Sequence, residues 1–441
     1  MLRIRVFSLL ISAFGITVPA TAGDTCLTYT TLGISFPPVS DDADRQFSQQ
    51  RLNDLGVTKI RFAESWALRE PQKGNANWKP LDDRIAWANS HGYDVLLTIQ
   101  ATGPSWACAG AKNKQSCVVS LPDFTAYVTT LAKRYSGKIA KIQFGNEWQS
   151  DYWYAGTAAE FIQTHNIVYD AVHEYMPSTT VVLGGFTTMS LRFMAACNGR
   201  VQSFYDDEGV LYDQNVVDEI CSSEEFKRAY GRIDSVLTLA RYDEADIHLY
   251  DDAEQWGEYY GNFLTLVDKP VIVTEFGGPN MNVEPYTEEY QAQRLKRYIM
   301  TLDSLKIREA YFFKLVEGSS NPAHGTSGLV NSTTLALKPA YTVFRQFSVC
   351  KPLNVVQDLQ YRAPRLSPNP ATGQVVITAD NCGLSGHGIR VYNNLGVRVI
   401  EANVSGTEQY MMDISTLCSG MYSVVVCCVS GPVLVGSLLV Q

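Results

Sequence analysis

Charged residues are sparse in this sequence, and basic residues are the rarer kind. Asp, Glu, Lys and Arg make up 18% of the 441 residues, and 36 basic residues stand against 45 acidic ones, for a formal net charge of −9. A polyanion would be repelled by this net negative charge, so we expect no nucleic acid partner. The 46% of hydrophobic residues also excludes an intrinsically disordered chain.

Motifs that hold nucleotides or metal ions are missing from the sequence. The glycine pairs at 184–185 and 277–278 come late and lack the G-x-G-x-x-G spacing of a dinucleotide site. Repeated Cys-x-x-Cys or Cys/His pairs, which are typical of a zinc site, do not occur either. We therefore expect neither a metal ion nor an organic cofactor.

Apolar runs long enough to cross a membrane are also missing. Residues 1–22 combine two early arginines, an apolar run at 6–18 and small residues at 20–22, which is the order of a secretory signal peptide. The run is shorter than the roughly 20 residues of a membrane span. The other apolar stretch, 424–440, is interrupted by Ser-Gly-Pro and predicts two strands. We expect export and no stable transmembrane segment.

The ten cysteines all follow this predicted signal, so they lie in a compartment where disulfides persist. Spacing favours three pairs, two that close short loops and one that joins the ends of a domain: Cys108 with Cys117, Cys197 with Cys221, and Cys26 with Cys350. The sequence alone leaves the connectivity open.

Strand-like and helix-like segments alternate up to residue 347. Apolar strand-like runs occur at 32–36, 59–63, 94–100, 140–145, 180–186, 245–250, 271–276 and 310–315. Helical patterns occur at 43–55, 81–91, 122–135, 158–175, 224–242, 254–267, 287–305 and 339–347. This alternation predicts an α/β fold, a (β/α)8 TIM barrel over residues 23–350. A doubly wound open sheet is the alternative, and it would need the phosphate-binding turn that is missing.

The pattern of strand-like and helix-like segments changes after residue 350. Short strand-like runs at 374–378, 389–392, 397–402, 409–414, 421–426 and 433–440 are separated by Gly, Asn, Ser and Pro. They predict a small all-β sandwich domain over 366–441, joined to the barrel by a linker at 351–365.

Two of the predicted barrel strands end in a glutamate. The fourth ends in Phe-Gly-Asn146-Glu147-Trp, and the seventh in Val-Thr-Glu275-Phe-Gly. The carboxyl ends of barrel strands share one mouth. Cleavage of a glycosidic bond with retention needs two carboxyl groups about 5 to 5.5 Å apart there, whereas inversion needs about 6.5 to 9.5 Å.

On these motifs, residues 32–347 resemble clan A of the retaining glycoside hydrolases, which includes cellulase-like, mannanase-like and β-xylosidase-like enzymes. The resemblance implies that Glu147 is the acid/base and Glu275 the nucleophile. It implies a secreted enzyme that cleaves O-glycosidic bonds, expected to be β bonds, in a polysaccharide or oligosaccharide. The alternative is a noncatalytic glycan-binding barrel, and the retention of both glutamates argues against it.

Further residues carry the same resemblance. Arg61 at the end of the second strand and the His248-x-Tyr250 pair at the end of the sixth match supporting positions of the clan, and Asn146 is placed to bind the sugar 2-hydroxyl. Sugar rings present apolar faces. We therefore expect an aromatic rim, with Trp106 after the third strand as one sugar contact.

Trp148, beside the predicted acid/base, is the second expected sugar contact. The eighth strand lacks the Trp of many clan members, which leaves Phe313 or a loop residue as its substitute, and Gln100 stands where cellulase relatives often have His. Glu317 and His324 follow in a polar loop after the eighth strand, for which two interpretations stay open: contact with a substrate, or a solvated loop, which is the favoured one. These departures leave the sugar, the linkage and endo or exo action open.

The tail carries its own motifs: Ser-Pro-Asn-Pro at 367–370, Val-Tyr-Asn-Asn-Leu-Gly at 391–396 and Asp-Ile-Ser-Thr-Leu-Cys-Ser-Gly-Met-Tyr at 413–422. It resembles the C-terminal sorting domain of the type IX secretion system of Bacteroidota-like bacteria. The resemblance implies export through the periplasm, recognition by the type IX machinery, and a secreted or cell-surface product. A carbohydrate-binding module is the alternative, but the tail has few aromatic residues.

Overall fold

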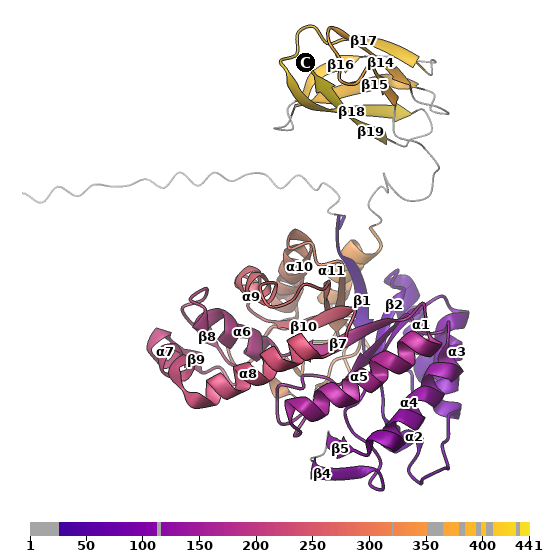
Figure 1. Ribbon diagram of the computed structural model, residues 1–441, viewed down its shortest axis with the longest axis vertical. Coiled ribbons are helices and arrows are strands. Elements are labelled where there is room, and N and C mark those ends of the chain that lie inside the picture. The colour runs from indigo at the N-terminus through magenta and orange to yellow at the C-terminus, as the bar shows by residue number, and fades with distance from the viewer. Residues whose placement is uncertain are drawn as a thin grey trace, which may run out of the picture. The chain divides into compact units, whose positions relative to one another are not determined.

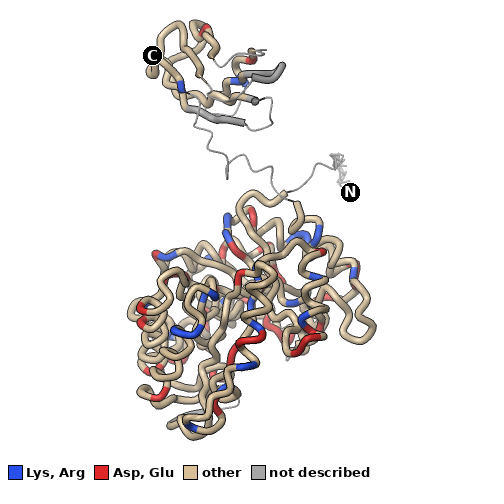
Figure 2. Tube along the Cα trace, turned by 90° about the vertical axis from the view of Figure 1, so that its right-hand side faces the viewer, with Lys and Arg blue, Asp and Glu red and all other residues tan. Residues whose placement is uncertain are grey.

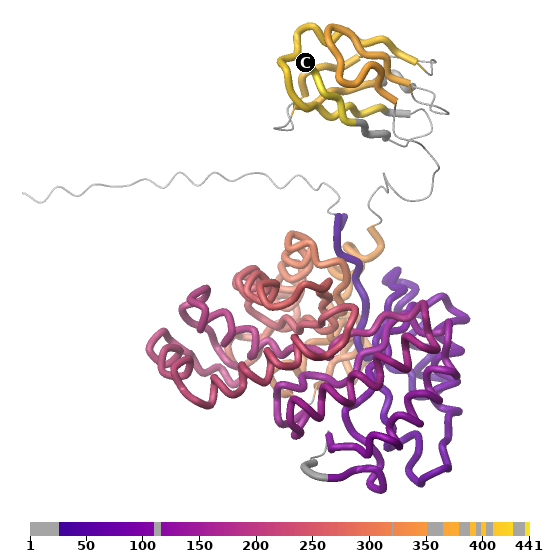
Figure 3. The backbone as a smooth tube through the Cα atoms, viewed as in Figure 1, coloured from indigo at the N-terminus to yellow at the C-terminus, as the bar shows by residue number. Residues whose placement is uncertain are grey.

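Eight parallel strands of the first unit, residues 1–350, close into a barrel wrapped by helices (Figure 1). In chain order the strands are β1 Thr31–Ser35, β2 Lys59–Glu64, β3 Asp94–Ile99, β6 Lys141–Phe144, β7 Thr180–Phe186, β10 Glu244–Tyr250, β11 Val271–Gly277 and β12 Glu309–Phe313. Strand β1 pairs with both β2 and β12, which closes the ring (Figure 3). This confirms the TIM barrel that the sequence predicts.

The computed structural model describes residues 26–112, 116–319, 321–350, 365–378, 384–393, 398–402, 409–428 and 433–441. The predicted signal peptide at 1–22 lies outside the described residues, as does the predicted linker except for its last residue. No helix in the described ranges is both long and apolar enough to span a bilayer.

The helices that follow the barrel strands lie where the sequence predicts them. They are α1 Asp42–Asp54, α3 Lys79–Ser90, α4 Leu121–Tyr135, α5 Ala158–Tyr175, α8 Glu224–Leu239, α9 Trp256–Phe263, α10 Glu288–Ser304 and α11 Pro339–Ser348. Their ends follow local chemistry: α5, for example, starts at a capping box in which Thr157 and Glu160 bond each other's backbone N–H groups.

Several short elements in the loops were not predicted. They are α2 Trp66–Arg69, the hairpin of β4 Cys108–Lys112 and β5 Cys117–Val119, helix α6 Thr188–Cys197, the hairpin of β8 Phe204–Tyr205 and β9 Leu211–Tyr212, helix α7 Gln214–Ser222 and the 3-10 turn η1 Pro322–His324. Most are too short to show a periodicity in sequence. Three of them, α6, the β8–β9 hairpin and α7, lie between β7 and β10 in the chain.

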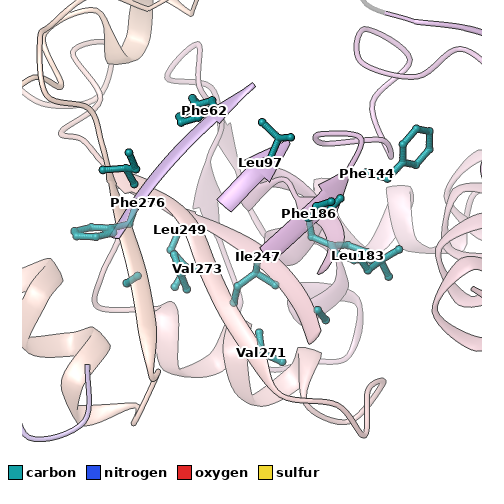
Figure 4. Close-up of a cluster of buried hydrophobic side chains, with 14 of the residues drawn as sticks. Phe62, Leu97, Phe144, Leu183, Phe186, Ile247, Leu249, Val271, Val273 and Phe276 are labelled. Atoms are coloured by element: carbon teal, nitrogen blue, oxygen red, sulfur yellow. The ribbon is translucent and has the colours of Figure 1, made fainter. Parts of the chain in front are cut away.

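Two apolar layers hold the barrel together. Side chains such as Phe62, Leu97 and Phe144 point outward from the strands and pack beneath the helices (Figure 4). Leu96 lies on the opposite face of β3 and joins a smaller interior cluster with residues of β7, β11 and β12. Fully burying one such side chain stabilises the fold by about 1.5 to 3 kcal/mol. The interior turns polar toward the carboxyl ends of the strands, where Arg61, on β2, is buried.

The three disulfides in the described residues are Cys26–Cys350, Cys108–Cys117 and Cys197–Cys221, the pairs that spacing favours. The first joins cysteines 324 residues apart and so ties the two ends of the barrel unit together.

Removing this long-range disulfide is expected to destabilise the barrel. Because the constraint on the unfolded chain grows with loop length, replacing Cys26 and Cys350, which are 324 residues apart, by Ala should lower the free energy of unfolding by about 5 to 6 kcal/mol. The same change at Cys108 and Cys117, which are 9 residues apart, should cost about 2 to 3 kcal/mol. Urea titration of both double variants measures this, and equal losses would contradict the loop-length argument.

The second unit, residues 351–441, contains two antiparallel sheets. One is formed by β13 Arg365–Ser367, β14 Gln374–Thr378 and β17 Gln409–Asp413, and the other by β16 Arg398–Ala402, β15 Leu384–Tyr392, β18 Gly420–Cys428 and β19 Val433–Val440. Val375 and Met412 from the first sheet share one core with Val391 and Val424 from the second. This is the small β-sandwich that the sequence predicts, with β13 as an additional strand.

Basic and acidic residues intermingle along the chain of the barrel unit in the view of Figure 2. Many of them are paired, as in the Arg134–Asp82 and Arg294–Glu254 ion pairs. Surface pairs of this kind contribute little to stability but keep both signs of charge distributed over the barrel.

Candidate active site

A sharp turn after β6 carries Asn146 and Glu147 into the barrel mouth. Gly145 (φ 75°) and Glu147 (φ 45°) both adopt left-handed backbone conformations. Such a conformation is costly for a residue with a side chain and is found where the surroundings enforce it, often at functional sites. Here the next residue, Trp148, is fully buried and its Nε1 donates to the carbonyl of Gly184 at 3.2 Å, which anchors the turn.

Glu275, on β11, has both carboxylate oxygens occupied by donors. Arg61 Nη1 donates to Oε1 at 2.6 Å, and the Tyr250 hydroxyl donates to Oε2 at 2.8 Å. Burial alone would raise the pKa of Glu275. The positive charges of His248 and Arg61, together with the hydrogen bonds from Arg61 and Tyr250, lower that pKa below its ordinary 4.5. Glu275 is therefore held as a carboxylate.

Arg61 joins the two glutamate-bearing strands. Besides its bond to Glu275, it donates from Nη2 to Asn146 Oδ1 at 2.7 Å and from Nε to Thr98 Oγ1 at 3.0 Å. Its side chain is fully buried, so each of these bonds is made away from water. The Asn146 amide is thereby fixed through its oxygen, and its NH2 group is not used by Arg61.

His248, on β10, lies between the two glutamates. Its Nδ1 is 2.8 Å from Glu147 Oε1, and its Nε2 is 3.3 Å from Thr274 Oγ1 and 3.7 Å from Glu275 Oε1. Burial favours the neutral ring, but the negative charge of Glu275 and hydrogen bonds with Asp246 and Glu147 raise the pKa of His248 to about 10. The ring is thus protonated at neutral pH, and both nitrogens donate.

The residues that support His248 were not predicted. Asp246 accepts from the Thr274 hydroxyl at 2.6 Å and from Gln143 Nε2 at 3.1 Å, and it is fully buried. An alternation signal was present in the sequence, since positions 246, 248 and 250 are all polar or aromatic and share one face of a strand. Gly185 is also required, because a Cβ there would lie 2.2 Å from His248 Nε2.

A cavity of about 580 Å³ opens over these residues. The predicted residues that line it are Arg61, Asn146, Glu147, Tyr250 and Glu275, together with Gln100 and Phe313. His248 is fully buried just behind Glu147. Aromatic rings of Phe36, Trp153 and Phe193 complete the wall, so the cavity combines apolar faces with convergent polar groups, as ligand sites do.

The expectation that Trp106 and Trp148 contact sugar is corrected by the structure, because neither lines the cavity. Trp106 Nε1 donates to the carbonyl of Glu70 at 3.0 Å and its ring packs edge-on against Trp66. Trp148 stacks on Phe161 in the core. Both are packing residues.

His324 is also not where the sequence suggested. It is 5% exposed instead of solvated, because the β12–α11 loop folds back over Tyr250, and the two rings lie 4.4 Å apart. Its neighbours Asp207 and Asp251 complete a group with the composition of a metal site. However, Arg192 is 3.7 Å from both of these carboxylates, and its positive charge opposes a cation there.

Comparison with known families decides the assignment of the barrel. The model of the cellulase family, glycosyl hydrolase family 5, matches residues 29–312. The chain belongs to glycosyl hydrolase family 5. Residues 29–312 are therefore a glycosyl hydrolase family 5 domain.

Curated relatives match only short stretches of this family 5 chain. Endo-1,4-beta-xylanase A of Fusarium oxysporum f. sp. lycopersici is 30% identical over 98 residues, which is 22% of this chain and 29% of that protein. A beta-galactosidase of Thermus thermophilus is 35% identical over 78 residues, 17% of this chain and 12% of that protein. The matched stretches span less than a third of either relative's length.

Solved structures share the fold of this family 5 chain. Exo-beta-1,4-mannosidase Op5Man5 from Opitutaceae bacterium strain TAV5 superposes with a TM-score of 0.51 at 15% identity, over 73% of this chain and 59% of that one. The GH5_18 protein of Bifidobacterium longum subsp. longum gives 0.51 at 14% identity, over 72% and 78%. At such identities the likeness establishes the barrel.

The tail matches a family of its own. Residues 365–432 correspond to the secretion system C-terminal sorting domain. The type IX sorting tail predicted from sequence is therefore confirmed, and it indicates a protein that is secreted or displayed on the cell surface.

Proposed function

We propose that this family 5 chain is a retaining glycosidase in which Glu275 is the nucleophile and Glu147 the acid/base. The observation that supports the proposal is that the two carboxyl groups lie in different surroundings. Glu275 is fixed by Arg61 and Tyr250 in its ionised form, whereas Glu147 is 20% exposed in the cavity and bonded to the protonated His248. Environments that differ in this way assign different roles to two carboxyls.

In the first step, a Glu275 oxygen attacks the anomeric carbon and forms a glycosyl ester, while Glu147 gives its proton to the departing glycosidic oxygen. His248 Nδ1 lies 2.8 Å from Glu147 Oε1 and holds that carboxyl group in place at the cavity. Asn146, aligned by Arg61, is placed to hydrogen-bond the sugar 2-hydroxyl. Phe313 and Phe36 offer apolar faces to the sugar ring.

In the second step, Glu147 takes a proton from a water molecule, which attacks the same carbon and releases Glu275. The carboxylate of Glu275 leaves readily because Arg61 and Tyr250 stabilise its negative charge. The two displacements restore the original anomeric configuration. Neither step calls on a metal ion or an organic cofactor.

The substrate we propose is a β-linked glycan. The named relatives are a xylanase, a β-galactosidase and a β-1,4-mannosidase, all of which act on β-linked sugars. We further propose that residues 23–350 form the catalytic domain, that 351–365 link it to a sorting domain at 366–441, and that the chain passes through the periplasm to the type IX machinery.

Hydrolysis of a panel of β-linked xylans, mannans, glucans and galactans and of aryl β-glycosides tests this function. The parent barrel should cleave at least one of them, and the Glu147→Gln/Glu275→Gln double variant should cleave none. A parent protein that binds glycans from the panel but cleaves none would favour the noncatalytic glycan-binding barrel instead.

The fall of kcat/KM on the acid side of the pH profile is expected to reflect protonation of Glu275. Because its pKa is lowered, kcat/KM should stay high as the pH falls and decline only below about pH 4.5. Replacing Tyr250 with Phe removes a donor to the ionised form, so this fall should move to higher pH. Measurements of kcat/KM between pH 3 and 8 test this, and a fall at unchanged pH would contradict the assigned role of Tyr250.

Arg232, on α8, is expected to position the turn that carries Glu147. Its Nη2 donates to the carbonyls of Trp148 at 3.1 Å, Tyr154 at 3.1 Å and Gly156 at 2.9 Å. Since a small misplacement of a catalytic group is costly, Arg232→Met should lower kcat/KM for natural substrates by about 10- to 100-fold.

The loss should be smaller for substrates whose leaving group needs no proton, which separates misplacement of the acid from general damage. Arg228→Met, an exposed arginine on the same helix, serves as the matched control. Equal losses with both kinds of leaving group would argue against a positioning role for Arg232.

A further inference from the structure

A second polar cluster adjoins Tyr250 and consists of Asp207, His324, Arg192 and Asp251. Arg192 and Asp251 line a neighbouring pocket of about 380 Å³. Asp207 and His324 line the cavity together with Glu147. The ring of His324 packs against that of Tyr250, whose hydroxyl is bonded to Glu275. The cluster therefore adjoins the place where the reacting sugar is proposed to lie.

Several polar atoms of this cluster are buried and have no hydrogen-bond partner among the described residues. They are Nδ1 of His324, Nε and Nη1 of Arg192, and both carboxylate oxygens of Asp251. The side chains of His324 and Arg192 are only 6% and 2% exposed. Buried polar groups are almost always paired in native proteins, so unpaired atoms on residues that line this cavity and the neighbouring pocket point to a polar ligand.

The residues of the cluster lie near one another without bonding directly. Arg192 is 3.7 Å from the nearest oxygens of Asp207 and Asp251, and His324 Nδ1 is 3.9 Å from Asp251 Oδ1. These separations are too long for direct hydrogen bonds. Two carboxylates, which accept hydrogen bonds, and one guanidinium, which donates them, therefore lie close together. Because both signs of charge are present, the fitting ligand is a neutral group that donates and accepts at once, as a hydroxyl does.

Two loops hold Asp207 in place. Asn321 Nδ2, from the β12–α11 loop, donates to its carboxylate at 2.7 Å. Asn280 and Asn282, from the β11–α10 loop, donate to its backbone carbonyl at 3.0 and 2.7 Å. A side chain fixed in this way is preorganised for binding, because little conformational freedom remains to be lost.

We propose that Asp207, Arg192, Asp251 and His324 form a subsite that binds neighbouring hydroxyl groups of one sugar unit of the substrate. The subsite rests on the proposed glycosidase function and adds to it the residues that read the hydroxyl pattern. Asp207 is the member most open to the cavity, with a side chain 38% exposed, so its replacement is compatible with folding.

Binding of the oligosaccharide that the parent protein cleaves best tests the subsite. The titration is done in the Glu147→Gln background to prevent turnover, and a β-linked glycan array replaces the oligosaccharide if none is cleaved. Loss of a charged hydrogen-bond partner should raise Kd by about tenfold or more in the Asp207→Ala variant. Glu208→Ala removes the same charge from the adjacent, exposed position and should leave Kd unchanged.

Asn321→Ala separates ligand binding from loop tethering, because it breaks the same loop contact but keeps the carboxylate. A smaller loss in Asn321→Ala than in Asp207→Ala supports the subsite, and an equal loss overturns it. A rise in thermal stability on adding Ca²⁺ or Zn²⁺ to the parent, absent in Asp207→Ala, would show a metal site and overturn it as well.

Failure of the subsite and failure of the proposed function give different results. A parent protein that cleaves its substrate, with Kd unchanged in Asp207→Ala, overturns the subsite alone. A parent protein that neither cleaves nor binds any β-linked glycan overturns both.

Discussion

Replacing Glu275 with Gln is expected to abolish hydrolysis, lowering kcat/KM by about 10,000-fold or more. The amide keeps the shape of the side chain but cannot form the glycosyl ester. It also removes the negative charge that Arg61 and His248 surround at 2.6 and 3.7 Å. Steady-state kinetics on the best substrate of the panel measures the loss.

The matched control for this variant is Glu258→Gln. The Glu258 side chain is 53% exposed and forms an ion pair with Arg200 at 3.5 Å. It should retain full activity. Thermal unfolding of both variants shows whether the barrel is intact, since removing one partner of a buried ion pair can itself destabilise a protein. A folded Glu275→Gln variant with substantial activity would show that another group is the nucleophile.

Replacing Glu147 with Gln is expected to cause a loss that depends on the leaving group. For natural glycosides, which leave only with a proton, kcat/KM should fall by about 100- to 10,000-fold. For dinitrophenyl glycosides, whose phenolate leaves without help, kcat/KM should fall much less. Comparing the two substrate types in the parent and variant proteins measures the effect.

A small external nucleophile provides the complementary test of Glu147. In the Glu147→Ala variant the second step lacks its base, so azide should accelerate turnover of dinitrophenyl glycosides and yield a glycosyl azide. Azide should have no such effect on the parent protein. An equal loss with both leaving groups, and no rescue, would argue that Glu147 has no role in proton transfer.

The fold was predictable because its signal is repeated along the chain. Every barrel strand is an apolar run with a helical pattern beside it, and the predicted bounds of the strand at 180–186 and the helix at 158–175 agree with β7 and α5. The glutamates at the ends of β6 and β11 were visible for the same reason: an ionisable residue that closes an apolar strand stands out.

The wall of the site was not predictable, because it depends on contacts between distant loops. Trp106 and Trp148 lie beside the mouth in sequence. In the fold Trp148 is fully buried and stacks on Phe161, whereas Trp106 is partly buried and packs against Trp66. Conversely, Asp207 and His324 are 117 residues apart in the sequence, and only the folded loops bring them to one cavity. The spacing of residues in the sequence does not indicate which loops meet in the folded protein.

The central claim is that Glu147 and Glu275 act by double displacement. The most direct test is the anomeric configuration of the first product, followed by proton NMR before mutarotation sets in. Two displacements at the same carbon predict that a β-linked substrate releases the β-anomer first. An initial α-anomer would mean a single displacement by water and would contradict the assignment of Glu275 as a nucleophile.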